Sequence, residues 1–217
     1  MPALQRPRPH YFVVLCCLVM LLVLPAVVSA FAGPGRALSL LGLLVPVLAV
    51  AAASDTRRHR RTAVVLAIVC AVTNAEGLAR LPTLPREVGA ATALLFLAYT
   101  TYLLLNGVLR SRRVTSDVIA GALASYLMIG LTWAIAYGLV ETMARGSISA
   151  AGGAPVDLQT LVYFSYITLM TIGYGDVTPV SAVARVLAVL EGVIGMAFTT
   201  IILATLVSIL LREKKED

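Results

Sequence analysis

Long apolar runs joined by short basic connections fill most of the chain, and this pattern restricts it to a membrane. A helix needs about 20 apolar residues to cross the hydrocarbon core of a bilayer. By that rule, helices are predicted at residues 11–31, 37–53, 62–79, 88–109, 118–140 and 180–211. Of the 217 residues, 59% are hydrophobic and 13% are charged, which excludes an ordinary soluble domain. The sequence therefore predicts an all-α membrane protein with six transmembrane helices.

The Lys and Arg residues indicate how these helices are oriented. With the amino terminus inside, 12 of the 17 basic side chains fall on the inner side of the membrane. Positive charge concentrates on the cytoplasmic side of membrane proteins. We therefore expect a multi-pass protein of the cell (plasma) membrane with both termini in the cytoplasm.

The first apolar run has an alternative interpretation as a secretory signal, because VSA at residues 28–30 resembles a cleavage site. The apolar core of such a signal is about 7–15 residues long, and this run is longer. A transmembrane helix is the favoured interpretation.

The basic clusters also bear on partners. The net charge of +6 lies in short connections between apolar runs, so it does not indicate nucleic-acid binding. Such clusters can contact anionic lipid headgroups at the inner membrane surface, although orientation alone explains them equally well. The residues concerned are Arg57, Arg58, Arg60, Arg61, Arg110, Arg112 and Arg113.

The apolar segment at residues 158–170 is too short to cross a bilayer and is followed by the polar stretch TIGYGD, residues 171–176. We therefore expect a re-entrant helix and loop between the last two spans. A non-helical backbone at membrane depth is tolerated only inside protein or along a water-filled path. Gly173 and Gly175 allow backbone angles that let successive carbonyls point to one side. Such a column of oxygens can replace the hydration shell of a cation, so the stretch is predicted to line a pore.

TIGYGD resembles the selectivity filter of potassium channels, in which Val stands where this chain has Ile172. The resemblance covers roughly the last two fifths of the chain. It implies that the carbonyls of Thr171, Ile172, Gly173 and Tyr174, with the Thr171 hydroxyl, coordinate K⁺, and that Gly175 shapes the outer mouth. A ring of carbonyls needs four filter strands, so the resemblance also implies a homotetrameric pore embedded in membrane lipid.

The same resemblance implies a support for the filter. Asp176 is expected just outside it, bonded to an aromatic residue of the short helix, for which Tyr163 is the positional match. The Ile172 side chain is expected to pack behind the filter. Asp157 is a favourable N-cap for the short helix, whose carboxyl end favours a cation at the membrane centre.

Two residues of the last helix complete the candidate site. Glu191 is an acid within an apolar run, and we expect it to form a structural hydrogen bond behind the filter or the short helix. Gly195 follows Gly175 by 20 residues, where related channels carry a hinge glycine. Close packing between helices explains Gly195 equally well, so both alternatives stay open.

The fourth predicted helix argues against voltage sensing. A voltage sensor needs about 3–4 gating charges per subunit, and residues 88–108 contain no Arg or Lys. Residues 1–113 are therefore predicted to form a four-helix domain resembling a voltage sensor without its charges, and residues 114–217 a pore domain. Glu76 and Arg80, one turn apart, are expected to form a structural pair.

The sequence thus predicts a potassium-selective channel that conducts K⁺ passively and without voltage gating. The alternative is a secondary cation transporter with a re-entrant loop, but such folds show interrupted helices in both halves. An enzyme is not expected, because the helices show neither a nucleophile with a base nor a cluster of metal ligands. No cofactor is expected, and K⁺ enters only as the permeant ion.

Overall fold

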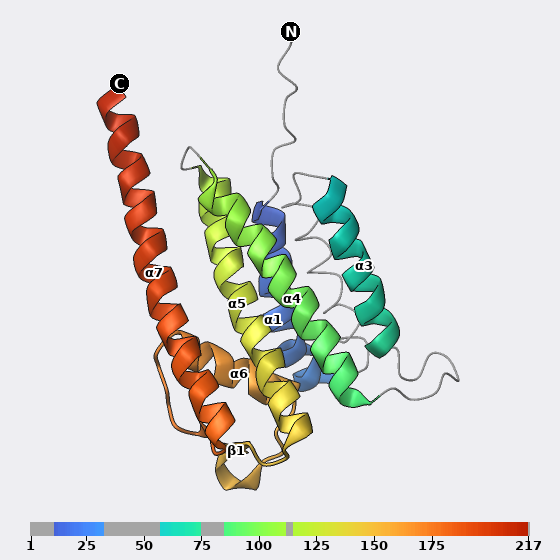
Figure 1. The fold of residues 1–217 in the computed structure, drawn as a ribbon. Helices are drawn as coiled ribbons and strands as arrows, with labels where there is room; N and C mark the ends of the chain where they lie inside the picture. The colour runs from blue at the N-terminus through green and yellow to red at the C-terminus, as the bar shows by residue number, and fades with distance from the viewer. Residues whose placement is uncertain (1–10, 33–56, 75–84, 112–114, 217) are drawn as a thin grey trace.

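The computed structural model describes residues 11–32, 57–74, 85–111 and 115–216, which form a bundle of long helices (Figure 1). The helices are α1 (Tyr11–Ala32), α3 (Arg57–Asn74), α4 (Arg86–Leu109), α5 (Ser116–Met143), α6 (Leu158–Leu169) and α7 (Ala182–Glu216). The shorter elements are the strands β1 (Ile148–Ala150) and β2 (Val177–Pro179) and the 3₁₀ turn η1 (Ala151–Gly153). The helix predicted at residues 37–53 and the pair Glu76 and Arg80 lie outside the described residues.

Three helical segments in the described residues are long and apolar enough to cross a membrane. They are Arg86–Leu109, Ser116–Met143 and Ala182–Ile202. Tyr11–Val23 and Leu158–Leu169 are shorter apolar segments. The chain is therefore a mostly helical membrane protein, and the segment before TIGYGD is a helix of only 12 residues.

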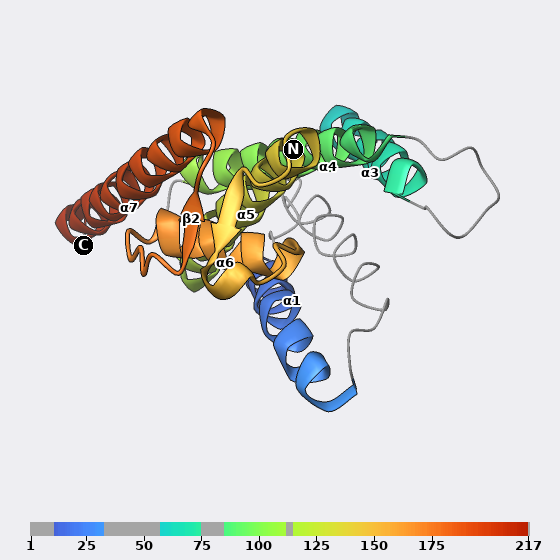
Figure 2. The same ribbon diagram turned by 90° about the horizontal axis from the view of Figure 1, so that it is seen from below.

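The long helices run side by side, with α7 at one edge of the bundle and α3 at the other (Figure 1). The start of α1, the end of α4, the start of α5 and the end of α7 lie at the same end of the molecule. The β1–β2 pair lies at the opposite end, and α6 lies across α5 beside α7 in the view from below (Figure 2). This arrangement places α6 and the TIGYGD loop toward one end of the bundle.

α4 and α5 form an antiparallel pair joined by only a short connection at residues 110–115. The buried residues between them and α1 form one cluster that includes Tyr11, Leu18, Leu104, Val118 and Met128. The hydroxyls of Thr101 in α4 and Thr132 in α5 lie 3.1 Å apart, within hydrogen-bond distance. The predicted regions 1–113 and 114–217 therefore share a continuous core.

The opposite side of α4 packs against α3. Ala63 and Cys70 of α3 are buried with Phe96 and Leu103 of α4. Cys70 thus lies in the core as a small apolar side chain, as its place in an apolar run indicates. α4 is consequently held on both sides, by α3 and by α5.

Two helix ends lie five residues beyond the predicted ones. α3 begins at Arg57 rather than at residue 62, and α7 continues to Glu216 rather than ending at residue 211. In both cases charged residues extend the helix beyond the apolar run. Arg, Lys and Glu are good helix formers, so a boundary set by hydropathy alone falls short of the true end.

The sequence analysis missed the short antiparallel pair of β1 and β2. Its register sets Ile148 opposite Pro179 and Ala150 opposite Val177. Each strand has three residues, too few for an alternating pattern to be recognised. The pair joins the loop after α5 to the segment after TIGYGD, and so fixes the outer end of the candidate site.

Replacing Gly121 with alanine tests the packing of α1 on α5. A Cβ there would lie 2.8 Å from Val108 Cγ2 and 2.9 Å from ring carbons of Tyr11, so a core side chain must move. We expect G121A to destabilise the protein by about 1–3 kcal/mol, the typical cost of overpacking. The measurement is thermal unfolding of the purified protein in detergent.

The matched control is G138A in the same helix. A Cβ at Gly138 would lie 3.6 Å from Leu161 Cδ1, an ordinary contact. Equal unfolding temperatures for the two variants would contradict the packing described.

Candidate functional site

The short helix α6 is fixed at both ends and along one face. Its N-cap is Asp157, as predicted: the carboxylate accepts hydrogen bonds from the Thr160 N–H at 2.9 Å and the Thr160 hydroxyl at 2.8 Å. Its buried face includes Phe164, whose ring meets that of Tyr137 in α5 edge to face at 4.9 Å. The helix is therefore anchored to α5 before the chain enters TIGYGD.

The carbonyl of Ile167, in the last turn of α6, holds the start of the following loop. It accepts hydrogen bonds from the N–H groups of Ile172 at 2.8 Å and Gly173 at 3.1 Å. The N–H of Thr171 donates to the Thr168 carbonyl at 2.9 Å. The N–H groups at the start of the loop thus all donate hydrogen bonds to carbonyls of α6.

Thr171 adopts an unusual backbone conformation, with a φ of 57°. Positive φ is uncommon outside glycine and is a genuine outlier for a β-branched residue. Such a conformation costs about 1–3 kcal/mol and persists only where the surroundings enforce it. The hydrogen bonds to Ile167 and Thr168 on either side provide that enforcement.

The carbonyls of the loop have no comparable partners. Within residues 115–216 and the other described segments, no N–H or O–H group donates a hydrogen bond to the carbonyl of Thr171, Ile172, Gly173 or Tyr174. Gly173 and Gly175 have φ angles of 58° and 81°, which glycine adopts without strain. The loop is therefore a run of peptide acceptors without donors, next to a helix end that favours positive charge.

The side chains of this loop are exposed in a single chain. Ile172 is 48% exposed and Tyr174 is 71% exposed. The expectation that Ile172 packs behind the filter is therefore not met within one chain, because the described residues leave about half of this side chain exposed. An apolar side chain beside a polar loop needs a further protein surface to bury it.

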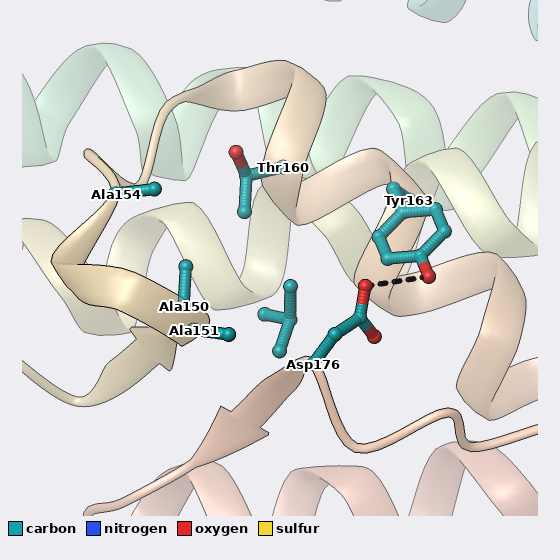
Figure 3. Close-up of a pocket in the computed structure, with 7 residues that line it drawn as sticks. Ala150, Ala151, Ala154, Thr160, Tyr163 and Asp176 are labelled. Atoms are coloured by element: carbon teal, nitrogen blue, oxygen red, sulfur yellow. Dashed lines mark hydrogen bonds between the residues drawn. The ribbon is translucent and has the colours of Figure 1, made fainter.

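Asp176 and Tyr163 lie together at the outer end of the loop. The Tyr163 hydroxyl donates to Asp176 Oδ2 at 2.8 Å, and both residues line a shallow pocket of about 360 Å³ (Figure 3). This hydrogen bond raises the pKa of the Tyr163 hydroxyl, which therefore remains a donor near neutral pH. The Asp176 carbonyl accepts from the Ala151 N–H at 2.7 Å, which ties the end of the loop to η1.

Glu191 lies behind α6, at the meeting point of three helices. It is fully buried, and its carboxyl group contacts Ser165 of α6 at 2.5 Å and Tyr137 of α5 at 2.6 Å. Ser165 also donates to the Gly130 carbonyl of α5 at 2.7 Å. The expected structural hydrogen bond is therefore present, and it connects α7 with both neighbouring helices.

Gly195, one turn after Glu191, is in close contact with the end of α6. A Cβ at Gly195 would lie 2.1 Å from the Leu169 carbonyl oxygen, whereas a Cβ at Gly192 would meet nothing within 4 Å. The Leu169 carbonyl also accepts from the Tyr126 hydroxyl at 3.1 Å. In this structure Gly195 allows close packing of α7 on α6, which is one of the two alternatives that the sequence leaves open.

Sequence reasoning missed two further contacts of the site. Glu141 accepts hydrogen bonds from the N–H groups of Gly146 at 2.7 Å and Ile148 at 3.0 Å, which closes the turn between α5 and β1. Tyr166 donates to the Leu127 carbonyl at 2.7 Å, and its ring fills the space left by Gly130. The Tyr166 contact joins residues 39 apart in sequence, and the Glu141 contacts close a turn that the sequence analysis did not recognise.

Comparison with known proteins agrees with this geometry. Residues 122–212 match a family model described as an ion channel. Over 89 residues the chain is 33% identical to two pore potassium channel c of Oryza sativa subsp. japonica. Residues 122–212 are therefore similar to ion channels of the potassium channel superfamily. The match covers 41% of this chain and 18% of the plant channel, and no solved structure matches the chain.

This similarity covers a defined set of helices and the TIGYGD loop. The matched residues 122–212 include most of α5, all of α6 and the TIGYGD loop, and most of α7. α1, α3 and α4 lie outside the match. The family relation therefore applies to the helix, short helix, loop and helix unit, and not to the helices that precede it.

Replacing Gly195 with alanine separates its two predicted roles. Because the Leu169 carbonyl occupies the position of the added methyl group, the backbone of α6 or α7 must move. We expect G195A to lower the unfolding temperature, with a free-energy cost of about 1–3 kcal/mol. The measurement is thermal unfolding in detergent.

G192A is the control, since its methyl group meets no atom within 4 Å in the chain. A pure hinge role for Gly195 gives the opposite pattern, in which G195A unfolds at the wild-type temperature. That result would contradict the packing role.

Proposed function

We propose that this protein is a potassium-selective channel in which four copies of residues 171–175 surround the conduction path. The observation that carries this proposal is the loop itself, whose carbonyls lack hydrogen-bond donors while its first N–H groups bond to α6. In the membrane such acceptors need water or a cation. A ring of carbonyls that replaces the hydration shell of K⁺ provides the second option.

The proposed coordinating groups are the carbonyls of Thr171, Ile172, Gly173 and Tyr174, together with the Thr171 hydroxyl. Gly175 shapes the outer mouth, and the Asp176–Tyr163 hydrogen bond supports it. K⁺ is the permeant ion in this proposal, and conduction is passive. The similarity to ion channels and the printed name of the plant relative support potassium as the ion.

The proposed assembly is a homotetramer. Each chain contributes one filter strand, whereas a closed ring around an ion needs four. The exposed side chains of Ile172 and Tyr174 gain cover when neighbouring subunits close that ring. The exposed apolar face of α7 fits the same assembly, with Val186, Val189 and Val193 each more than half exposed.

The proposed channel opens without a voltage sensor. The charged residues of α4 are Arg86 and Glu87, both in its first turn. α4 is packed between α3 and α5 through apolar contacts and the Thr101–Thr132 contact. No charge is therefore placed to move through the membrane field with α4, whereas steep voltage dependence requires several per subunit.

The proposed topology has six spans in the plasma membrane, with residues 1–113 as the preceding domain, residues 114–217 as the pore domain and both termini inside. The shared end of α1, α4, α5 and α7 is then the cytoplasmic end (Figure 1). Arg58, Arg60, Arg61 and Arg110 are exposed there and can contact anionic lipid. Arg57, Arg112 and Arg113 belong to the same proposal.

Ion selectivity is the primary test. We expect purified protein in planar bilayers to give a current whose reversal potential follows the K⁺ gradient when K⁺ and Na⁺ are unequal across the membrane. G173A should abolish this current, because Gly173 has a φ of 58° that alanine rarely adopts.

The matched control is G152A in η1, whose φ of 70° imposes the same kind of strain away from the loop. G152A should conduct K⁺ as the wild type does. Equal permeability to K⁺ and Na⁺ would contradict potassium selectivity. Flux driven by the gradient of another solute would contradict a channel and favour a transporter.

Voltage dependence is the second test. The open probability in the same recordings should change little across the accessible voltage range, because α4 carries no charge beyond its first turn. A steep opening curve, of the kind that requires several gating charges per subunit, would refute this part of the proposal.

A further inference from the structure

The buried carboxyl group of Glu191 belongs to a set of hydrogen-bond contacts that the hydroxyl hydrogens alone cannot satisfy. Three contacts between oxygen atoms meet around it: Tyr137 with Oε2 at 2.6 Å, Ser165 with Oε1 at 2.5 Å, and Ser165 with the Gly130 carbonyl at 2.7 Å. Each such contact needs one hydrogen between its two oxygens. The cluster of Glu191, Tyr137, Ser165 and the Gly130 carbonyl therefore needs three hydrogens, one for each of its three contacts.

The two hydroxyl groups supply only two hydrogens. A serine or tyrosine hydroxyl carries one hydrogen, and the carbonyl of Gly130 can only accept. If Ser165 donates to Glu191, its oxygen faces the Gly130 carbonyl as a second acceptor at 2.7 Å. If Ser165 donates to Gly130 instead, the Ser165–Glu191 contact has no hydrogen unless Glu191 supplies one.

We propose that Glu191 carries its proton in the folded pore and donates it to Ser165, so that a neutral acid joins α5, α6 and α7. Ser165 then donates to Gly130, Tyr137 donates to Glu191, and every contact has its hydrogen. Removing that proton loosens the attachment of α6 to α7.

The surroundings of Glu191 favour the neutral form. The titratable groups that face it are Tyr126 and Tyr137 from α5 and Tyr166 from α6, all of them neutral donors. Among the described residues, no Lys, Arg or His forms an ion pair with Glu191, and the side chain is fully buried. A buried carboxylate without a cation is costly, and the cost disappears when the group is protonated.

The neutral acid holds the part of α6 that leads into the filter loop. Ser165 lies one turn before Leu169, and Glu191 lies one turn before Gly195, which contacts the Leu169 carbonyl. The two turns therefore pack along each other. On the proposed function, loss of the proton would displace the end of α6 and the loop that follows, and conduction would fall as the pH becomes alkaline.

Infrared spectroscopy of the purified protein in lipid tests the protonation directly and needs no ion flux. A protonated carboxylic acid has a C=O stretching band separate from the bands of carboxylates. We expect this band at neutral pH in the wild type, its loss in E191Q, and its retention in E87Q, whose glutamate is exposed at the start of α4. A wild-type spectrum without the band, or a band unchanged in E191Q, would overturn the proposal.

Thermal unfolding provides the second readout. The glutamine of E191Q offers an N–H donor to Ser165 and a carbonyl to Tyr137, so it reproduces the neutral acid. E191Q should unfold at the wild-type temperature at neutral pH and show no loss at alkaline pH, where the wild type unfolds earlier. If the unfolding temperatures of the wild type and E191Q fell equally at alkaline pH, the proposal would be overturned even if the protein conducts K⁺.

Discussion

Peptide carbonyls at membrane depth require a hydrogen-bond donor, water or a cation, and this requirement explains how α5, α6 and α7 are arranged around the TIGYGD loop. The loop at residues 171–175 presents its carbonyls without donors because the N–H groups of Ile172 and Gly173 are already bonded to Ile167. That arrangement is useful only if α6 is held in place. The N-cap at Asp157, the ring contact of Phe164 with Tyr137 and the Asp176–Tyr163 hydrogen bond all serve to hold it.

The rigid attachment of α6 depends on polar contacts that water cannot replace. Glu191, Ser165 and Tyr137 are each fully buried, so an unmatched donor or acceptor among them would destabilise the protein by about 1–3 kcal/mol. The Leu169 carbonyl, at the end of α6, accepts from Tyr126 and packs against Gly195. The position of α6, and with it the geometry of the loop, is therefore fixed by contacts with α5 and α7. The preceding helices α1 and α4 pack against α5.

The sequence predicts those parts of the site that depend on residues close together in the chain. TIGYGD, the short helix before it and the Asp157 N-cap follow from local composition and backbone chemistry, and α6 ends within one residue of its predicted end. The β1–β2 pair, the turn closed by Glu141 and the partners of Glu191 could not be predicted. The β1–β2 pair and the partners of Glu191 join residues that only tertiary packing brings together, whereas the Glu141 turn is local but follows no pattern that was recognised. A glycine at position 195 is compatible both with a hinge and with a close helix contact, so the sequence alone does not separate them.

The central claim is that the carbonyls of Thr171, Ile172, Gly173 and Tyr174 are the ion sites. Anomalous X-ray diffraction from crystals of the assembled protein grown with Rb⁺, which substitutes chemically for K⁺, locates bound ions directly. The account predicts a column of anomalous peaks on a four-fold axis, each surrounded by these carbonyl oxygens. Ordered Rb⁺ peaks elsewhere, with none between these carbonyls, would contradict it.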